Sequence, residues 1–177
     1  MSGEGPVGGG FRRFLVKPLE VLLIVAMAAM TLDVLWGVFS RFILGSQTRW
    51  TEELAIYLLI WISLLGASLT YGERGHLGVD YFVQKLEKKA QFLASIVVEL
   101  MVLLFSVFGL LYGGWMLVSK TLAAGQVSPT LGWPMGFIYL AAPVSGLFFT
   151  LFAVEHLVRL MKQGAVESEN DNPIEDV

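Results

Sequence analysis

The sequence contains no cysteine, which excludes disulfide bonds, thiolate metal sites and cysteine nucleophiles. Charged residues are also scarce: they make up 15% of the 177 residues, against about a quarter in soluble domains. Hydrophobic residues make up 55%, so too little polar surface is present to cover a water-soluble globule of this size. The net charge is only −3 and no basic stripe stands out, so nothing indicates binding to nucleic acid. The composition indicates a single membrane domain over residues 1–177.

Four stretches are long and apolar enough to cross a bilayer, whose hydrocarbon core of about 30 Å needs about 20 helical residues. The fold class is therefore expected to be an all-α integral membrane protein, with spans at approximately residues 19–44, 52–73, 92–119 and 133–158. Residues 1–10 and 163–177 are expected to be flexible tails. The first apolar stretch is too long for a secretory signal and no cleavage site follows it, so we expect it to be retained. Pro134 suits a first helical turn, whereas Pro143 is expected to kink the fourth span.

Lysine and arginine are unevenly distributed between the two sides of the membrane. Nine lie in the two tails and in the connection between spans two and three, and three lie on the other side. This asymmetry predicts that both termini are cytoplasmic. Within that connection, residues 79–91 place apolar side chains at helical spacing and lysines on the remaining face, which is typical of an amphipathic helix in the membrane interface. The alternative is an amphipathic extension of span three that packs on another protein.

Several polar residues lie inside the predicted spans, where charge is costly. Asp33 is near the middle of span one, on a stripe of small and polar residues that includes Gly37 and is expected to pack on another helix. Asp33 is either a proton or sodium site or a packing residue, and the packing interpretation is favoured because no second carboxylate is clearly at its depth. Span three carries a similar stripe with Glu99 and the pair Gly109 and Gly113, whose GxxxG spacing permits close approach of another backbone.

The start of span two combines a helix-initiation signal with charge. Thr51 is a candidate N-cap, and Glu52 and Glu53 suit the positive end of the helix dipole. Arg41 and Arg49 are near enough in sequence to pair with them, and Trp50 suits the membrane interface.

The two histidines raise a haem hypothesis, because some membrane anchors hold haem between helices. His76 and His156 are both expected near the surface rather than in an apolar slot, so haem is not expected. No metal-ligand spacing, phosphate-binding loop or nucleophile motif is present, and we expect neither a cofactor, a metal nor an enzyme activity.

The run from Val38 to Phe82, VFSRFILGSQTRWTEELAIYLLIWISLLGASLTYGERGHLGVDYF, resembles the small membrane subunit of tripartite ATP-independent periplasmic (TRAP) transporters. The shared pattern is an arginine and an aromatic ending span one, Trp-x-Glu-Glu opening span two, and a tryptophan followed by Gly-Ala within it. An arginine and a histidine with a hydrophobic-x-Val-Asp run follow. The residues are Arg41, Phe42, Trp50, Glu52, Glu53, Trp61, Gly66, Ala67, Arg74, His76, Leu77, Val79 and Asp80.

The resemblance implies a subunit of a bacterial inner-membrane transporter. In such systems a periplasmic binding protein captures a carboxylate-bearing solute, and a large membrane subunit moves it inward on a sodium gradient. The small subunit is implied to scaffold the large one, so the expected partners are the large subunit, the binding protein and membrane lipids. The acidic C-terminal tail leads us to expect a separate polypeptide rather than a fusion. Two alternatives remain: a self-sufficient homo-oligomeric transporter or channel, and a membrane anchor of a redox enzyme.

Overall fold

The computed structural model describes residues 8–45, 49–73 and 88–170. The helices are α1 (Gly8–Ile43), α2 (Arg49–Glu73), α4 (Lys88–Leu104), the π-helix η1 (Phe105–Gly113), α5 (Gly114–Ala123), α6 (Met135–Tyr139) and α7 (Ala141–Asn170). The described chain is helical apart from its connections, and four helical stretches are long and apolar enough to span a membrane: Val16–Ile43, Arg49–Glu73, Ala90–Ala123 and Met135–Lys162. The predicted all-α membrane fold is thus confirmed. Most of the predicted interfacial helix, up to residue 87, lies outside the described residues, and its last residues open α4.

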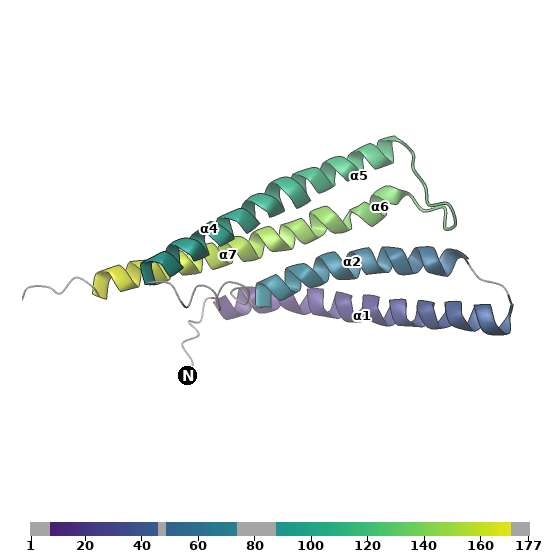
Figure 1. Cartoon of the computed structure of the whole chain (residues 1–177), viewed down its shortest axis with the longest axis horizontal. Coiled ribbons are helices and arrows are strands. Elements are labelled where there is room, and N and C mark those ends of the chain that lie inside the picture. Colours follow the sequence, from purple (N-terminus) through teal and green to yellow (C-terminus); the bar gives the residue numbers. More distant parts are fainter. Residues whose placement is uncertain (1–7, 46–48, 74–87, 171–177) are drawn as a thin grey trace, which may run out of the picture.

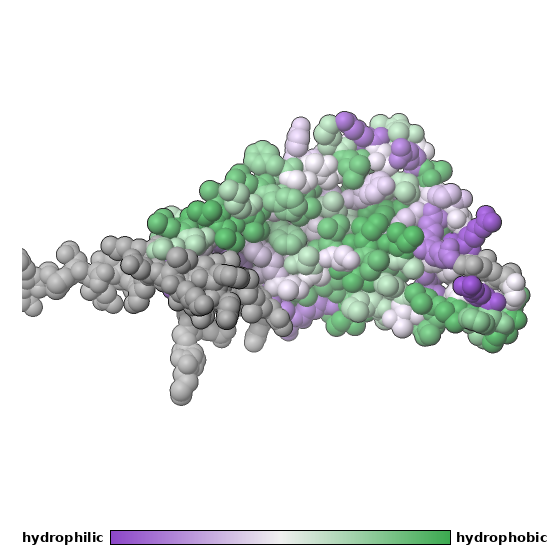
Figure 2. All heavy atoms as spheres, viewed as in Figure 1, coloured by the Kyte–Doolittle hydropathy of each residue, from purple (hydrophilic) through white to green (hydrophobic). Residues whose placement is uncertain are grey.

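The helices form two antiparallel hairpins, shown in Figure 1. One consists of α1 and α2, and the other of the continuous rod α4–η1–α5 followed by α6 and α7. α7 lies between α2 and the rod and contacts both, whereas α1 contacts α2 alone among the described elements. Burial follows this arrangement: 39% of the residues in the apolar segment of the fourth span are buried, against 6% in that of the first span. Figure 2 shows apolar side chains over the helices and polar ones gathered where the connections lie at one end. Most of α1 is therefore available to lipid or to another protein.

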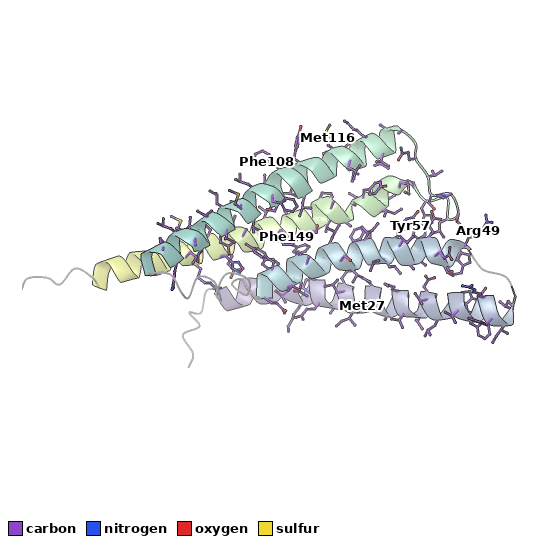
Figure 3. The ribbon with its side chains drawn as sticks, viewed as in Figure 1. Met27, Arg49, Tyr57, Phe108, Met116 and Phe149 are labelled. Atoms are coloured by element: carbon purple, nitrogen blue, oxygen red, sulfur yellow. The ribbon has the colours of Figure 1, made fainter. Side chains whose placement is uncertain are left out.

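A close contact within the second hairpin runs along η1 and α7. The Ser106 and Thr150 hydroxyls lie 3.0 Å apart and share a hydrogen bond. A Cβ atom at Gly146 would lie 2.7 Å from Leu110 Cβ and 3.0 Å from the Leu111 nitrogen. Side chains on the opposite side of the rod, such as the labelled Phe108 and Met116, project outward in Figure 3. The small residues let the two backbones approach closely.

The π-helix changes which face of span three is packed. Along the rod from Ser106, the packed residues recur every four positions and include the buried Gly114 and Val118. An α-helix has only about 3.6 residues per turn. The turn of a π-helix is wider, so a repeat of four residues stays on the same face there. Gly114 is consequently the glycine against α7, and its Cβ would lie 2.9 Å from the ring of Pro143. Gly109 is exposed, so the predicted GxxxG pair does not make the close contact within the described chain.

The fourth span is interrupted where Pro143 predicts it. α6 ends at Tyr139, four residues before the proline, and α7 begins at Ala141. The nitrogen of Pro143 has no hydrogen to donate to the Tyr139 carbonyl, which accounts for the break. Pro134 is the N-cap of α6. The preceding connection folds back on itself: the Ser128 amide donates to the Trp133 carbonyl at 2.8 Å, and the Met135 amide donates to the Gln126 carbonyl at 2.9 Å. Gly132 supplies the left-handed turn, with φ of 68°.

Candidate functional site

At its N-terminal end, α2 is joined to the α5–α6 connection through Glu53. One carboxylate oxygen accepts hydrogen bonds from the backbone amides of Thr130 (3.0 Å) and Leu131 (3.1 Å). The other accepts the hydroxyl of Tyr57, one turn later, at 2.5 Å. The same hydroxyl lies 3.4 Å from the Met135 sulfur at the start of α6. A single carboxylate therefore links the first hairpin to the second at this end of the molecule. Its hydrogen bonds are strong ones, because a charged acceptor binds amide donors more strongly than a neutral one does.

The other residues predicted at this end have different surroundings. Arg41, Trp50 and Glu52 are exposed. α2 begins at Arg49, so Thr51 lies inside the helix and the prediction that it is the N-cap was wrong. Thr51 is instead buried between the helices, where a Cβ on Gly37 would meet its hydroxyl oxygen at 3.1 Å. Gly37 thus permits the close approach of α1 to α2.

At the opposite end, three helices meet around Glu99 of α4. The Tyr71 hydroxyl of α2 donates a hydrogen bond to one Glu99 oxygen, and His156 Nδ1 of α7 lies 3.5 Å from the other. The Tyr71 ring also lies 5.2 Å from the imidazole and 5.4 Å from the Phe149 ring, measured between centroids. Glu99 and His156 are only 4% and 6% exposed. The expectation that His156 lies near the surface was wrong: the neighbouring acid lets a polar side chain be buried here.

Close packing of α2 on α7 accompanies this polar cluster. Phe152 is fully buried, and a Cβ at Gly72 would lie 2.7 Å from two of its ring carbons. Glu155, one turn further on the partly exposed side of α7, pairs with Arg159 at 2.9 Å. The carboxylates of Glu99 and Glu155 are therefore both held by groups on α2 or α7.

Asp33 occupies a different kind of position. It is 7% exposed, and neither carboxylate oxygen has a hydrogen-bond partner in the described part of the chain. It lies one turn before Gly37 on the side of α1 that faces α2. No group of three or more potential metal ligands is found among the described residues.

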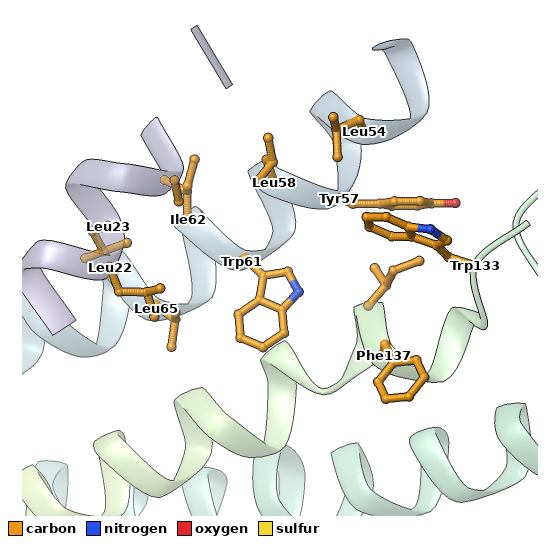
Figure 4. Close-up of a pocket in the computed structure, with 12 residues that line it drawn as sticks. Leu22, Leu23, Leu54, Tyr57, Leu58, Trp61, Ile62, Leu65, Trp133 and Phe137 are labelled. Carbon is orange, nitrogen blue, oxygen red and sulfur yellow. The ribbon is translucent and has the colours of Figure 1, made fainter. Parts of the chain in front are cut away.

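An apolar groove follows α2 between these two polar ends, drawn in Figure 4. Its volume is about 280 Å³ and its exposed lining is entirely apolar. α1 borders it at one end and α6 with the preceding connection borders it at the other. Among the lining residues are Leu22, Leu54, Trp61, Leu65, Trp133 and Phe137.

Residues 30–163 match the family of tripartite ATP-independent periplasmic transporters, DctQ component. The chain belongs to this family. It is 30% identical over 145 residues to a Haemophilus influenzae protein named as a TRAP transporter small permease, covering 82% of this chain and 88% of that one. It is 26% identical over 143 residues to the small permease of a sialic acid TRAP transporter from Vibrio cholerae, covering 81% of each. An isethionate TRAP transporter permease of Oleidesulfovibrio alaskensis is 33% identical over 114 residues, 64% of this chain and 17% of that protein.

The resemblance noted in the sequence is thereby confirmed, and the TRAP small subunit is a multi-pass membrane protein. Of the motif residues, Glu53 forms the link to the α5–α6 connection and Trp61 lines the groove. Beyond its own turn of α2, Gly66 has no described heavy atom within 4 Å of an added Cβ, so packing among the described residues does not require a glycine there. Arg74, His76 and Asp80 lie outside the described residues.

Sequence reasoning missed the partners of the two carboxylates in this TRAP small subunit. Tyr57 could have been found, because it lies four residues after Glu53 and the two side chains share a helical face. The amides of Thr130 and Leu131 carry no sequence signal. Tyr71 and His156 reach Glu99 only through the packing of α2 and α7 on α4.

Proposed function

We propose that this TRAP small subunit scaffolds a large membrane subunit in sodium-driven, binding-protein-dependent uptake of an organic anion. The observation that carries the proposal is the attachment of α2 to the second hairpin at both ends, by Glu53 and by the Glu99 cluster. These carboxylates are occupied in joining helices. Such a frame suits a fixed element against which another subunit moves.

The similarity to the isethionate permease supports a large partner. This chain corresponds to only 17% of that much longer polypeptide, so a segment like this one occurs in the same chain as further permease sequence. Separate subunits with the same arrangement would meet through the surfaces that this chain leaves open.

The open face of α2 is our candidate for that contact. Ser63, Ala67 and Thr70 are exposed, and Gly66 is half-buried, so small side chains form a stripe along the helix away from the groove. Small residues allow another helix to approach closely, which drives association in a membrane, where lipid tails are as apolar as leucine. Bulky residues such as Leu32, Leu35 and Phe39 cover the outward face of α1 and suit lipid.

The proposed solute class and orientation rest on the relatives and on charge. Relatives are named for sialic acid, C4-dicarboxylates and isethionate, all organic anions, and a carboxylate-bearing solute is our proposal for this transporter. The excess of Lys and Arg in the tails and in the connection between spans two and three supports cytoplasmic termini in a bacterial inner membrane.

Affinity purification of this chain from its native membrane in mild detergent, with mass spectrometry, tests the scaffold role. We expect a large multi-span permease in roughly equal amount, and solute uptake by proteoliposomes only when that permease and the binding protein are also present. Uptake by this chain alone, or its recovery only as a homo-oligomer, would refute the proposal and favour a self-sufficient transporter.

A matched pair of variants tests the contact face. Ala67→Leu adds bulk to the small stripe of α2, and Ala28→Leu adds the same bulk to the outward face of α1; both alanines are exposed. We expect Ala67→Leu to lower recovery of the large permease and Ala28→Leu to leave it unchanged. Equal recovery with both variants would remove the α2 stripe from the interface.

A further inference from the structure

The apolar groove along α2 has the dimensions of a single hydrocarbon chain. It extends from Leu54 to Leu65, eleven residues that correspond to about 16 Å of helix. One leaflet of a bilayer contributes about 15 Å to a hydrocarbon core of about 30 Å. The groove is therefore about as long as the acyl region of one leaflet is deep.

The groove is narrow as well as long. Its volume is about 280 Å³, which suits a slender apolar group that lies along α2. An α-helix is about 10 Å across, so a helix of another subunit would lie over the groove and insert side chains into it.

The chemistry of the lining points to the same occupant. Tyr57 turns its hydroxyl to Glu53 and Met135, so the phenol ring is what it contributes to the groove. Leu22, Trp133 and Phe137 are each about half exposed, which leaves the groove open at its sides. Inside a bilayer, an unfilled apolar groove forfeits dispersion contacts along its whole lining. Acyl chains are the surrounding medium and are available to fill it.

The mouth of the groove has the features of a membrane interface. Trp133 lies beside Tyr57 at that end in Figure 4, and Trp50 precedes Leu54 by one turn on the same face of α2. Tryptophan is enriched at the level of lipid headgroups. The end of the groove away from Trp133 is formed by aliphatic side chains, Leu22 and Leu65. This polarity matches a lipid whose headgroup is at the Trp50 end.

We propose that the groove between α1, α2 and α6 binds one acyl chain of a phospholipid from the leaflet at the Trp50 end of α2. The bound chain lies in the space bordered by α1, α2 and α6, so the lipid forms part of the packing between the two hairpins. Since lipid tails in the bilayer are as apolar as the groove, selection rests on shape rather than on the hydrophobic effect.

Photolabelling in membranes that contain the full-length chain and its co-expressed permease tests this site. Two phosphatidylethanolamines are used, one with a diazirine near the acyl carbonyl and one with a diazirine near the terminal methyl. After irradiation, adducts are located by mass spectrometry. We expect the first probe to label near Leu54 and Trp133, and the second near Leu22 and Leu65.

Two substitutions fill the groove from different helices, and a third is the control. Ala26→Phe on α1 and Leu58→Trp on α2 both add bulk to lining positions, whereas Ala29→Phe adds it to an exposed position outside the lining. We expect the first two to lower groove labelling severalfold and the control to leave it unchanged. If Ala26→Phe fails to fold, as judged by gel filtration, Leu58→Trp decides the outcome.

Three results would overturn the proposal. The first is labelling by both probes at the same positions, which would show no ordered chain. The second is labelling of the groove that is no stronger than that of the outward face of α1 and is insensitive to the filling substitutions. The third is groove labelling that occurs in membranes with this chain alone and is lost in membranes that also contain the permease. That result would make the groove a contact for side chains of the permease.

Discussion

Substitution of Gly146 by alanine tests the packing of η1 on α7. The new Cβ would lie 2.7 Å from Leu110 Cβ and 3.0 Å from the Leu111 nitrogen. Two carbon atoms are most stable at about 3.5–4.0 Å, so the helices must separate by roughly 0.8 Å. The nearest atoms belong to the backbone or to a Cβ, and no rotamer change can relieve the contact. Overpacking of this kind costs about 1–3 kcal/mol.

Two smaller effects adjust that magnitude. Separation of the helices weakens the hydrogen bond between Ser106 and Thr150, worth about 1 kcal/mol. Replacing a helical glycine recovers about 0.5–1 kcal/mol, because glycine loses the most conformational freedom on folding. We therefore expect Gly146→Ala to lower the free energy of unfolding by about 1–3 kcal/mol.

Gly66→Ala is the matched control, because no described atom beyond its own turn of α2 lies within 4 Å of its added Cβ. Gly66→Ala removes only the conformational entropy that a glycine loses on folding, without a steric clash. It should therefore raise the free energy of unfolding by about 0.5–1 kcal/mol. Reversible denaturant unfolding of the purified chain in detergent, followed by tryptophan fluorescence, measures both variants. If Gly146→Ala proves as stable as Gly66→Ala, the close approach of η1 to α7 is not as the structure has it.

Three further substitutions probe the polar groups. Asp33→Leu should leave unfolding unchanged or make it harder by about 1–3 kcal/mol, because it removes a buried carboxyl without hydrogen-bond partners; loss of transport with stability retained would instead favour a proton or sodium site. Tyr71→Phe should lower the unfolding free energy by about 1–3 kcal/mol, since Glu99 loses a buried donor, and an unchanged value would show that His156 alone satisfies the acid. Glu53→Ala should speed deuterium exchange at the Thr130 amide, and less at the Leu131 amide, which also donates to the Ser128 hydroxyl at 3.1 Å, while Glu52→Ala changes neither; equal protection of Thr130 in both variants would contradict the link.

Composition and periodicity were sufficient for the architecture. Four apolar runs of about 20 residues with little charge indicate membrane spans. A run of that length crosses the bilayer as a helix, because a spanning backbone must satisfy its own hydrogen bonds. The break before Pro143 was likewise predictable, since proline lacks the donor that the turn requires. The family, too, could be identified from the spacing of its motif residues, and the match over residues 30–163 confirms it.

The packed face of span three was less predictable. The helical period used for the sequence places Gly109 and Gly113 on one stripe with Ser106. Nine residues of π-helix advance the packed face to Gly114 instead. An insertion of this kind depends on contacts with α7 and leaves no pattern in the local sequence.

The sequence by itself determined the number of membrane spans, the family and the identity of the residues that carry charge within the spans. Only the tertiary structure decided what those residues do. Glu53 binds amides 77 and 78 positions away, and Glu99 meets a tyrosine 28 positions earlier in the chain. Burial of His156 and the groove along α2 have the same origin. Helix periodicity specifies which face a side chain occupies, whereas the packing of distant helices specifies what lies opposite that face.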